Sequence, residues 1–599
     1  MTAGAEMSFD TGGPRPHTRI TNASAEPDWV ERTDVSEEVE ASGVVVRTHS
    51  VAAMDLTVFI AQQIHTMNPS LPHATAVVVA NGMIVEVGTR ESVQPWLDSH
   101  PHRIDETFAD KVLLPGFIDP HLHPSMAALL MPMHFITALP WRLPDRTVAG
   151  VQGHQEYLDR LAEIEASISD PGEPLMTWGY HNLWHGELHR HMLNAISPTR
   201  PIVVWQRSFH EIFMNDAAIA YVGLDEARLE AHPQVDVAAG RFFESGQMMA
   251  AGQMTGYLTE TARFAHGLEI TKQAIHAGGH TTIGDLTGSY FDTDDEWDSL
   301  CAVLDTDDTP FRVQMIPMGT RKMGGPGHTA ALAHVQQRAE RSTEKLFYRK
   351  HVKLFADGGF FAQAMQVQPP GFIDGHHGEW MFAPEQVEEL ARIYWNDGYQ
   401  IHVHCTGDMG VQLAIDVLEK LQWERPRFDH RFTIEHFGLS TPEQVQKLAA
   451  LGAIVSANIY YVHELGEKYW AESVGHERAS QMARLGTLAR HGVITALHSD
   501  FTMAPAEPLV SAWVAVNRIG EQGAVVGPEE RISVHQAMKA ITIDAAYVLG
   551  MEHEIGSIRS GKKADFTVLK SDPYEVDPAS LNDIAIWGTV FEGQLFQLC

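Results

Sequence analysis

The sequence predicts an α/β fold, a (β/α)8 TIM-like barrel beside a composite β-sandwich that both chain ends form. In the centre, eight short apolar segments alternate with helical patterns, which is typical of parallel strands joined by helices. Near each chain end, β-branched runs are separated by turn residues. Polar side chains suited to metal binding follow several central strands, and active sites lie at that end of a barrel.

The N-terminal region opens with a polar, acidic stretch, residues 1–53, that predicts a disordered extension. It lacks a basic segment followed by an apolar core, so we expect no signal peptide. A strand pattern follows Met54, which makes it the candidate native start. Leu56–Met67 predicts that strand, and Thr75–Gly88 predicts a hairpin. Its Asn81-Gly82 pair supplies the positive φ angles that a type I′ turn requires.

The C-terminal region contains two more strand-like segments, Ala564–Leu569 and Ala585–Phe596. The simplest arrangement joins residues 54–112 with residues 555–599 in one composite β-sandwich beside the central domain. Two unrelated β pieces are the alternative.

Residues 113–554 form the predicted barrel. Its eight strands are Leu113–Ile118, Thr281–Thr287, Phe311–Met318, His351–Ala356, Gln400–Thr406, Phe432–Phe437, Ala453–Ile459 and Val493–Leu497. Helical patterns between them cover Glu296–Leu304, Glu385–Trp395, Gly410–Leu421, Thr441–Leu451 and Glu477–Arg490. The first connection, at about 124–271, is unusually long and holds strand candidates at Leu175–Tyr180 and Pro201–Ser208. Such an insertion typically builds a substrate pocket or a lid.

The composition limits the partners of the protein. The chain carries 77 acidic and 43 basic residues, a formal net charge of -34, which argues against nucleic acid and anionic membranes. The sequence has no apolar window of about 18 residues, so we predict no membrane span. The three scattered cysteines fit a reduced compartment, and we expect a cytoplasmic protein.

Metal-capable side chains stand at the ends of five predicted barrel strands. Alternation along an extended chain puts His121 and His123 on one side of the first strand, where they could hold one ion. Taken alone, such a pair more often consists of solvated or core histidines than of metal ligands. The other candidates are Lys353 on the fourth strand, His402 and His404 on the fifth, His436 on the sixth and Asp500 after the eighth.

These residue types suit zinc and similar divalent ions, which prefer imidazole nitrogen and carboxylate oxygen. Two ions about 3.5–4 Å apart can share a hydroxide that is nucleophilic near neutral pH. Lys353, desolvated near cations, would lose its proton easily and could take up CO2 to form a bridging carbamate. The alternative is a lysine paired with Asp357 or with a substrate anion. Asp500 would bind a metal and carry the proton between the attacking water and the leaving group.

Several segments together resemble the amidohydrolase superfamily, and more narrowly its YtcJ-like family 3 group. They are PGFIDPHLH, KLFADGG, HCTGD, TIEH, HSD and SIRSGKKADFTVL, and the likeness spans about Leu56–Phe596. The resemblance implies a metal-dependent hydrolase whose ligands are His121, His123, Lys353 as the carbamate, His404, His436 and Asp500. It favours His404 over His402 because the family pattern His-x-x-Gly-Asp matches His404, Gly407 and Asp408.

The resemblance also points to His210 in the insertion, which could polarise the scissile carbonyl; a core histidine is the alternative. It places Trp178, Gly179 and Tyr180 at the pocket wall. The chain departs from the family pattern at His498, where glycine is common, and in GGFFAQAMQ after Lys353, which replaces a polar run. These departures put any one relative's substrate in doubt.

The leading functional hypothesis is hydrolysis of a C–N bond in a small amide, N-acyl or N-formyl compound, with two Zn²⁺ ions per chain. A deaminase, an ester, lactone or carbamate hydrolase, and a non-catalytic regulatory protein on the same fold are the alternatives. Aromatic and Met residues on the pocket loops predict an apolar or aryl substrate group. They are Met131, Met133, Trp141, Trp184, Tyr290, Phe360, Phe361, Tyr460 and Tyr461. Arg207 and Arg321 are the basic candidates there, and a homodimer is the default assembly.

Overall fold

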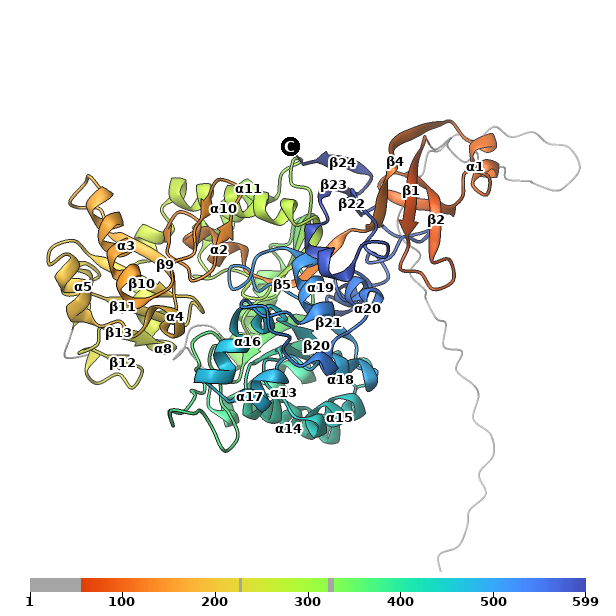
Figure 1. Cartoon of the computed structure of the whole chain (residues 1–599). Helices are drawn as coiled ribbons and strands as arrows, with labels where there is room; N and C mark the ends of the chain where they lie inside the picture. The colour runs from red at the N-terminus through yellow and green to blue at the C-terminus, as the bar shows by residue number, and fades with distance from the viewer. Residues whose placement is uncertain (1–54, 226–228, 321–327, 599) are drawn as a thin grey trace, which may run out of the picture. The chain divides into compact units, whose positions relative to one another are not determined.

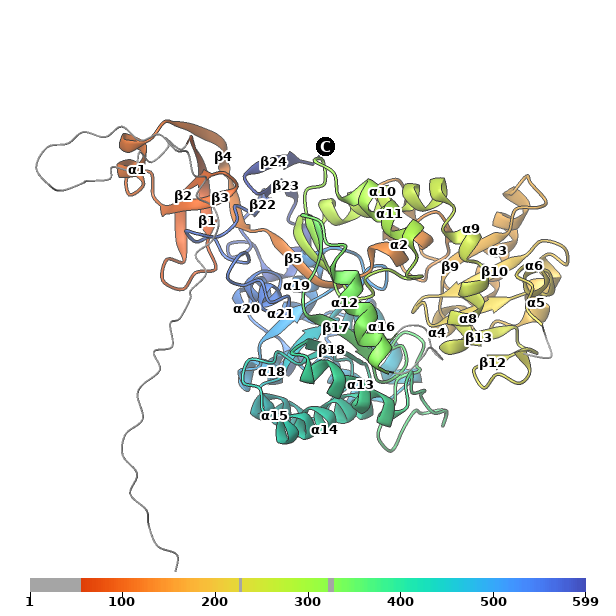
Figure 2. The same cartoon turned by 180° about the vertical axis from the view of Figure 1, so that it is seen from behind.

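Strands from both chain ends hydrogen-bond into one seven-stranded sheet, in the order β24-β23-β22-β4-β1-β2-β3 (Figures 1 and 2). They are β1 (Leu56–His65), β2 (His73–Ala80), β3 (Met83–Gly88), β4 (His102–Pro115), β22 (Phe566–Leu569), β23 (Ile586–Phe591) and β24 (Gln594–Gln597). The computed structural model describes residues 55–225, 229–320 and 328–598. The predicted extension at residues 1–53, Met54 and Arg321 lie outside the described residues.

The long strand β4 joins the two halves of this sheet. Strand β1 pairs with it between His102 and Leu113, and β22 pairs with its last residues. Phe59, on β1, packs against Phe108 and Phe566 in one buried cluster, with ring centroids 5.4 and 6.4 Å away. The predicted union of both chain ends is therefore confirmed.

Tight turns set the ends of these strands. Asn81 and Gly82 have φ angles of 50° and 75° between β2 and β3, as the type I′ prediction requires. The segment Ala585–Phe596, predicted as one strand, is instead the hairpin of β23 and β24. Glu592 and Gly593 reverse the chain there with φ angles of 47° and 80°.

Seven of the predicted barrel strands are present near their predicted positions, whereas the first, predicted at Leu113–Ile118, covers the end of β4 and only the first two residues of β5. The barrel strands are β5 (Phe117–Leu122), β14 (His280–Asp285), β15 (Arg312–Met315), β17 (His351–Phe355), β18 (Gln400–Cys405), β19 (Thr433–His436), β20 (Ile454–Ala457) and β21 (Thr495–Leu497). They pair in parallel as two groups, β16-β15-β14-β5 and β17-β18-β19-β20-β21. The additional strand β16 (Leu346–Tyr348) was not predicted. A bridge between Met318 and Lys353 joins the groups at one seam, and the Asp500 N–H donates to the His121 carbonyl, at 2.9 Å, across the other.

Helices follow most of the barrel strands. They are α11 (Asp294–Leu304), α12 (His328–Ala339), α13 (Pro384–Asn396), α14 (Asp408–Glu424), α15 (Pro442–Leu451), α16 (Tyr460–Glu472), α19 (Pro508–Asn517), α20 (Val534–Ala540) and α21 (Ile543–Val548). The predicted helix Glu477–Arg490 is divided into α17 (His476–Ser480) and α18 (Leu485–Arg490). Ala483 interrupts it with a φ of 45°, and its N–H donates to the Gly438 carbonyl instead of continuing the helix.

Local sequence signals explain where a helix such as α15 begins and ends. Thr441 and Gln444 form a reciprocal capping box, which satisfies two backbone N–H groups at the helix start. Gly452 ends the helix with a left-handed φ of 72°, a conformation that glycine adopts without steric penalty. Such signals set the first and last residues of a helix that follows a barrel strand.

The insertion between β5 and β14 builds a second α/β layer. It begins with α2 (Pro124–Leu130), ends with α10 (Thr261–Ala277), and contains a six-stranded sheet in the order β12-β13-β11-β10-β9-β6. The sheet strands are β6 (His134–Phe135), β9 (Leu175–Tyr180), β10 (Ile202–Gln206), β11 (Glu211–Met214), β12 (Val235–Asp236) and β13 (Arg241–Phe243). Its helices are α3 (His154–Ser167), α4 (Asn182–His185), α5 (Arg190–Ile196), α6 (Asp216–Tyr221), α8 (Ser245–Gln253) and α9 (Thr255–Leu258). Both predicted strands of the insertion are present, as β9 and β10. Among the described residues, no helix combines the length and apolar character needed to cross a bilayer.

Candidate metal centre and active site

A cavity of about 120 Å³ lies at the C-terminal ends of the barrel strands. All seven residues that the sequence singled out as metal ligands or catalytic groups line it: His121, His123, His210, Lys353, His404, His436 and Asp500. Six come from barrel strands or the residues that follow them, and His210 precedes β11 of the insertion. Closure of the barrel therefore brings together side chains from positions 121 to 500.

His121, His123 and Asp500 form one group of donors whose ligand atoms lie within 4.8 Å of one another. The Asp500 Oδ1 atom lies 3.0 Å from His123 Nε2 and 3.5 Å from His121 Nε2. Buried Asp119 supports the group, because it accepts from the backbone N–H of His121 at 3.1 Å and of Ser499 at 3.0 Å. Asp500 and His436 have left-handed φ angles of 54° and 69°, a backbone strain that is typical of functional sites.

Glu435 is a buried residue that hydrogen-bonds two histidines of the barrel. Its two carboxylate oxygens accept from His121 Nδ1 at 2.7 Å and from His402 Nδ1 at 2.6 Å. His402 Nε2 also contacts His351 Nδ1 at 3.0 Å, and burial lowers the pKa of His402 to about 3. His402 thus supports Glu435, whereas His404 lines the cavity. The choice of His404 as a metal ligand stays a prediction.

Lys353 is 1% exposed, and its Nζ atom has no hydrogen-bond partner among the described residues. Burial lowers its pKa to about 8, against the opposing charges of Glu435 and Asp500. The alternative partner Asp357 instead accepts the backbone N–H groups of Gln366, Thr406 and Gly407 at 2.7–2.9 Å. The Lys353–Asp357 pair is therefore not formed.

The insertion contributes an imidazole and a carboxylate. His210 Nδ1 donates to Glu244 Oε2 at 2.8 Å. Burial opposes protonation of His210, but the Glu244 carboxylate outweighs it and raises the pKa of the imidazole. Sequence reasoning did not identify Glu244, since no local motif links it to a histidine 34 positions earlier in the chain.

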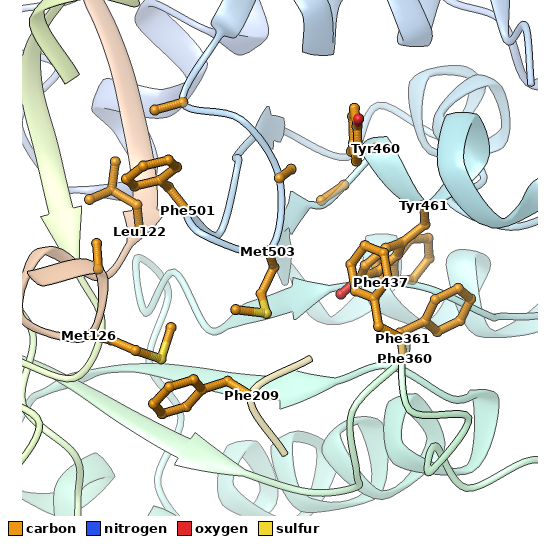
Figure 3. Packing of buried hydrophobic residues seen from close by; sticks show 14 of the residues in the cluster. Leu122, Met126, Phe209, Phe360, Phe361, Phe437, Tyr460, Tyr461, Phe501 and Met503 are labelled. Carbon is orange, nitrogen blue, oxygen red and sulfur yellow. The ribbon is translucent and has the colours of Figure 1, made fainter. Parts of the chain in front are cut away.

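The apolar lining of the cavity differs from the predicted set. It comprises Met126, Phe209, Met248, Tyr290, Met318, Phe355, Met381 and Met503, of which only Tyr290 was predicted. The other predicted residues, with Trp178 and Tyr180, belong to hydrophobic clusters and are not among the residues that line the cavity. Figure 3 draws Met126, Phe209 and Met503 together with Phe360, Phe361 and Tyr461, and all six belong to one hydrophobic cluster.

Arg207, a predicted substrate contact, is also part of the core. Its guanidinium forms a buried ion pair with Glu464 at 3.0 Å. It also packs over the rings of Trp141, Trp178 and Phe361 at 4.6–5.0 Å. The described lining of the cavity contains no arginine. A strongly anionic substrate would therefore meet no guanidinium group among the described residues that line the cavity.

The residues present fit a divalent metal ion. Two groups have donor atoms within 4.8 Å of one another: His121, His123 and Asp500, and His121, His436 and His498. His123 Nδ1, Asp285 Oδ2 and Lys353 Nζ are buried without hydrogen-bond partners in the described part of the chain. The hydrogen bond from His121 to Glu435 is the support that metal-binding imidazoles generally have. The site is thus a candidate metal centre.

Replacing Glu435 with Gln should weaken metal binding by about 10–100-fold, the usual loss when an outer partner of a ligand is removed. The Gln amide has one carbonyl oxygen, so it can accept from only one of His121 and His402. A chelator competition titration measures the affinity. Glu530→Gln is the matched control, since Glu530 is 2% exposed and accepts from Thr487. Equal affinities in the two variants would contradict the role of Glu435.

Replacing Glu244 with Gln should lower kcat at least about tenfold, because hydrogen bonds to charged groups contribute about 1.5–3 kcal/mol. Loss of the Glu244 carboxylate should also lower the pKa of His210. Because the protonated imidazole is the form that polarises the carbonyl, the alkaline limb of the kcat profile should then move to lower pH. Steady-state kinetics across pH measure both effects. Glu260→Gln, at the exposed N-cap of α10, is the control. An unchanged pH profile of kcat would contradict the role of His210 in polarising the substrate carbonyl.

The parallel barrel and the polar residues at its C-terminal end define the class of metal-dependent hydrolases. The chain belongs to amidohydrolase family 3, since the sequence profile of that amidohydrolase family matches residues 109–596.

Known proteins extend this result. The chain is 24% identical to the protein named YtcJ of Bacillus subtilis (strain 168), over 89% of this chain and 97% of that one. It is 23% identical to N-substituted formamide deformylase of Arthrobacter pascens, over 87% of this chain and 94% of that one. The structure resembles that of an uncharacterized metal-dependent hydrolase from Pyrococcus horikoshii, with a TM-score of 0.66 and 19% identity over 87% of this chain and 99% of that one. The structural likeness supports the barrel fold.

Proposed function

We propose that the protein hydrolyses a C–N bond in a small amide, N-acyl or N-formyl compound that carries an apolar or aryl group. The observation that carries the proposal is the convergence of the seven polar residues on one cavity with Met and aromatic walls. Such walls favour an apolar substituent over a charged one. The likeness to an N-substituted formamide deformylase supports the same substrate class.

We assign two Zn²⁺ ions to the centre. His121, His123 and Asp500 would hold one ion, and His404 and His436 the other. Lys353 would take up CO2 on its Nζ atom with loss of one proton, and the resulting carbamate would join the two ions. The unpartnered Nζ atom of Lys353 supports this modification. When bound, the ions would activate water for attack and polarise the substrate carbonyl.

The side chains then have separate tasks. Asp500 accepts a proton from the attacking water and returns it to the leaving nitrogen. His210, held by Glu244, donates a hydrogen bond to the carbonyl oxygen, where negative charge develops. The apolar walls bind the substituent and exclude water, which strengthens these polar interactions.

Metal content and a substrate panel test the proposal together. Elemental analysis of protein purified without chelators should find about two zinc ions per chain. The panel compares N-benzyl and N-alkyl formamides and acetamides with aminoheterocycles, aryl esters and lactones. We expect turnover of the formamides or acetamides and a preference for benzyl over short alkyl groups. Turnover confined to aminoheterocycles or esters would favour the alternative reactions, and protein that takes up no metal would favour a non-catalytic role.

A further inference from the structure

His498 is a buried imidazole that the proposed function does not use. It follows β21, is 1% exposed, and stands where the related family commonly has glycine. Its Nε2 atom lies 3.3 Å from His436 Nδ1, and its ring centroid lies 4.4 Å from that of His121. One nitrogen from each of these three rings lies within 4.8 Å of the other two.

This spacing is compatible with shared coordination. Zinc binds imidazole nitrogen at about 2.0–2.1 Å with tetrahedral angles, so two nitrogens on one ion are about 3.3–3.4 Å apart. The 3.3 Å separation of His498 Nε2 and His436 Nδ1 agrees with that value. Three imidazoles with an open fourth position are one of the known donor sets of catalytic zinc.

The surrounding hydrogen bonds orient two of the rings toward such a site. His121 Nδ1 is engaged by Glu435 at 2.7 Å, which leaves Nε2 as its free nitrogen. His498 Nδ1 contacts Ser456 Oγ at 2.7 Å and lies 3.6 Å from a carboxylate oxygen of Glu435. A proton on His498 Nδ1 is therefore directed at these two acceptor oxygens. The lone pair of His498 Nε2 then faces His436.

We propose that His498 is a metal ligand that completes a three-imidazole position with His121 and His436. The inference rests on the proposed metal-dependent function and adds a ligand to its site. His121 has one free nitrogen, so it binds the ion either here, together with His436, or beside His123 and Asp500, with His436 then left for the other ion. The two positions are alternatives for one ion, and the all-nitrogen position favours zinc and similar ions over magnesium or calcium.

The substitution His498→Asn distinguishes the role of Nε2 from that of Nδ1. The Asn amide N–H2 group can still donate to Ser456, but it has no counterpart of Nε2. We expect zinc affinity, measured by chelator competition, to fall by more than about 100-fold, beyond the 10–100-fold typical of a lost outer partner. The visible bands of the cobalt(II)-substituted protein should also change. Ser456→Ala should give the smaller loss.

His280→Asn is the matched control, since His280 is a fully buried histidine on β14 whose Nδ1 bonds the Ile275 carbonyl. Native affinity in His498→Asn, or a loss below 100-fold with unchanged cobalt bands, would overturn the ligand role. Native protein that binds no zinc would instead refute the metal centre itself.

A crystal structure of the native zinc-loaded protein tests the same inference without a variant. Zinc anomalous density within bonding distance of His498 Nε2 would support it. Density beside His123 and Asp500, with none beside His498, would contradict it while leaving the proposed hydrolase intact.

Discussion

Replacing Asp500 with Asn should slow hydrolysis by about 10²-fold or more while most of the metal stays bound. The Asn oxygen can still face an ion, but the amide cannot accept and return a proton at neutral pH. Asp500 is placed for that task, because its Oδ1 atom is 3.0 Å from His123 Nε2 and its Oδ2 atom is 3.6 Å from His436 Nδ1.

Steady-state kinetics and elemental analysis of the same preparations measure this effect. Asp408→Asn is a suitable control, because Asp408 is also buried but pairs with Arg478 at 2.8 Å and does not line the cavity. A low kcat together with native metal content would support the proton-transfer role. Near-native kcat in Asp500→Asn would assign the proton transfer to another group.

Replacing Lys353 with Ala should remove at least one metal ion per chain and abolish most of the activity. The proposed carbamate provides a carboxylate to both ions, and Ala provides no donor. The buried Nζ atom has no hydrogen-bond partner among the described residues, so the loss cannot be attributed to a broken ion pair. A small carboxylate such as acetate should restore part of the metal and part of the activity, because it fits the space left by the side chain.

Metal analysis with and without added acetate tests this expectation. Lys272→Ala is the matched control: Lys272 is a buried lysine on α10 that bonds Asp308 at 2.9 Å. Full metal occupancy in Lys353→Ala would refute the bridging carbamate. Loss of metal without acetate rescue would leave Lys353 necessary for binding but would argue against a carboxylate at that position.

Much of the fold could be predicted because its signals are local. Apolar runs of strand length located seven of the barrel strands and the start of β5, and Asn81-Gly82 located a hairpin turn. The errors also have local causes. Ala483 is not a typical helix-breaking residue, so sequence reasoning did not detect the division of Glu477–Arg490 into two helices.

The cavity was predicted less completely than the barrel. Six of the seven polar residues meet because parallel barrel strands end on one side, and the insertion adds His210. The prediction of the aromatic pocket walls was mostly wrong. Phe360 and Tyr461, for example, pack on each other with ring centroids 4.3 Å apart. Composition identifies such side chains as apolar, but it does not distinguish a core from a pocket.

The sequence by itself determined the class of fold, the strand ends and the kinds of donor atom at them, because periodicity and motif spacing are properties of neighbouring residues. Only the tertiary structure decided which side chains support those donors. Glu435 hydrogen-bonds His121 across 314 positions of the chain. Glu244, which follows β13 of the insertion, hydrogen-bonds His210. His498 meets His121 only when the barrel closes. Such contacts depend on chain closure over long separations, which no local pattern encodes.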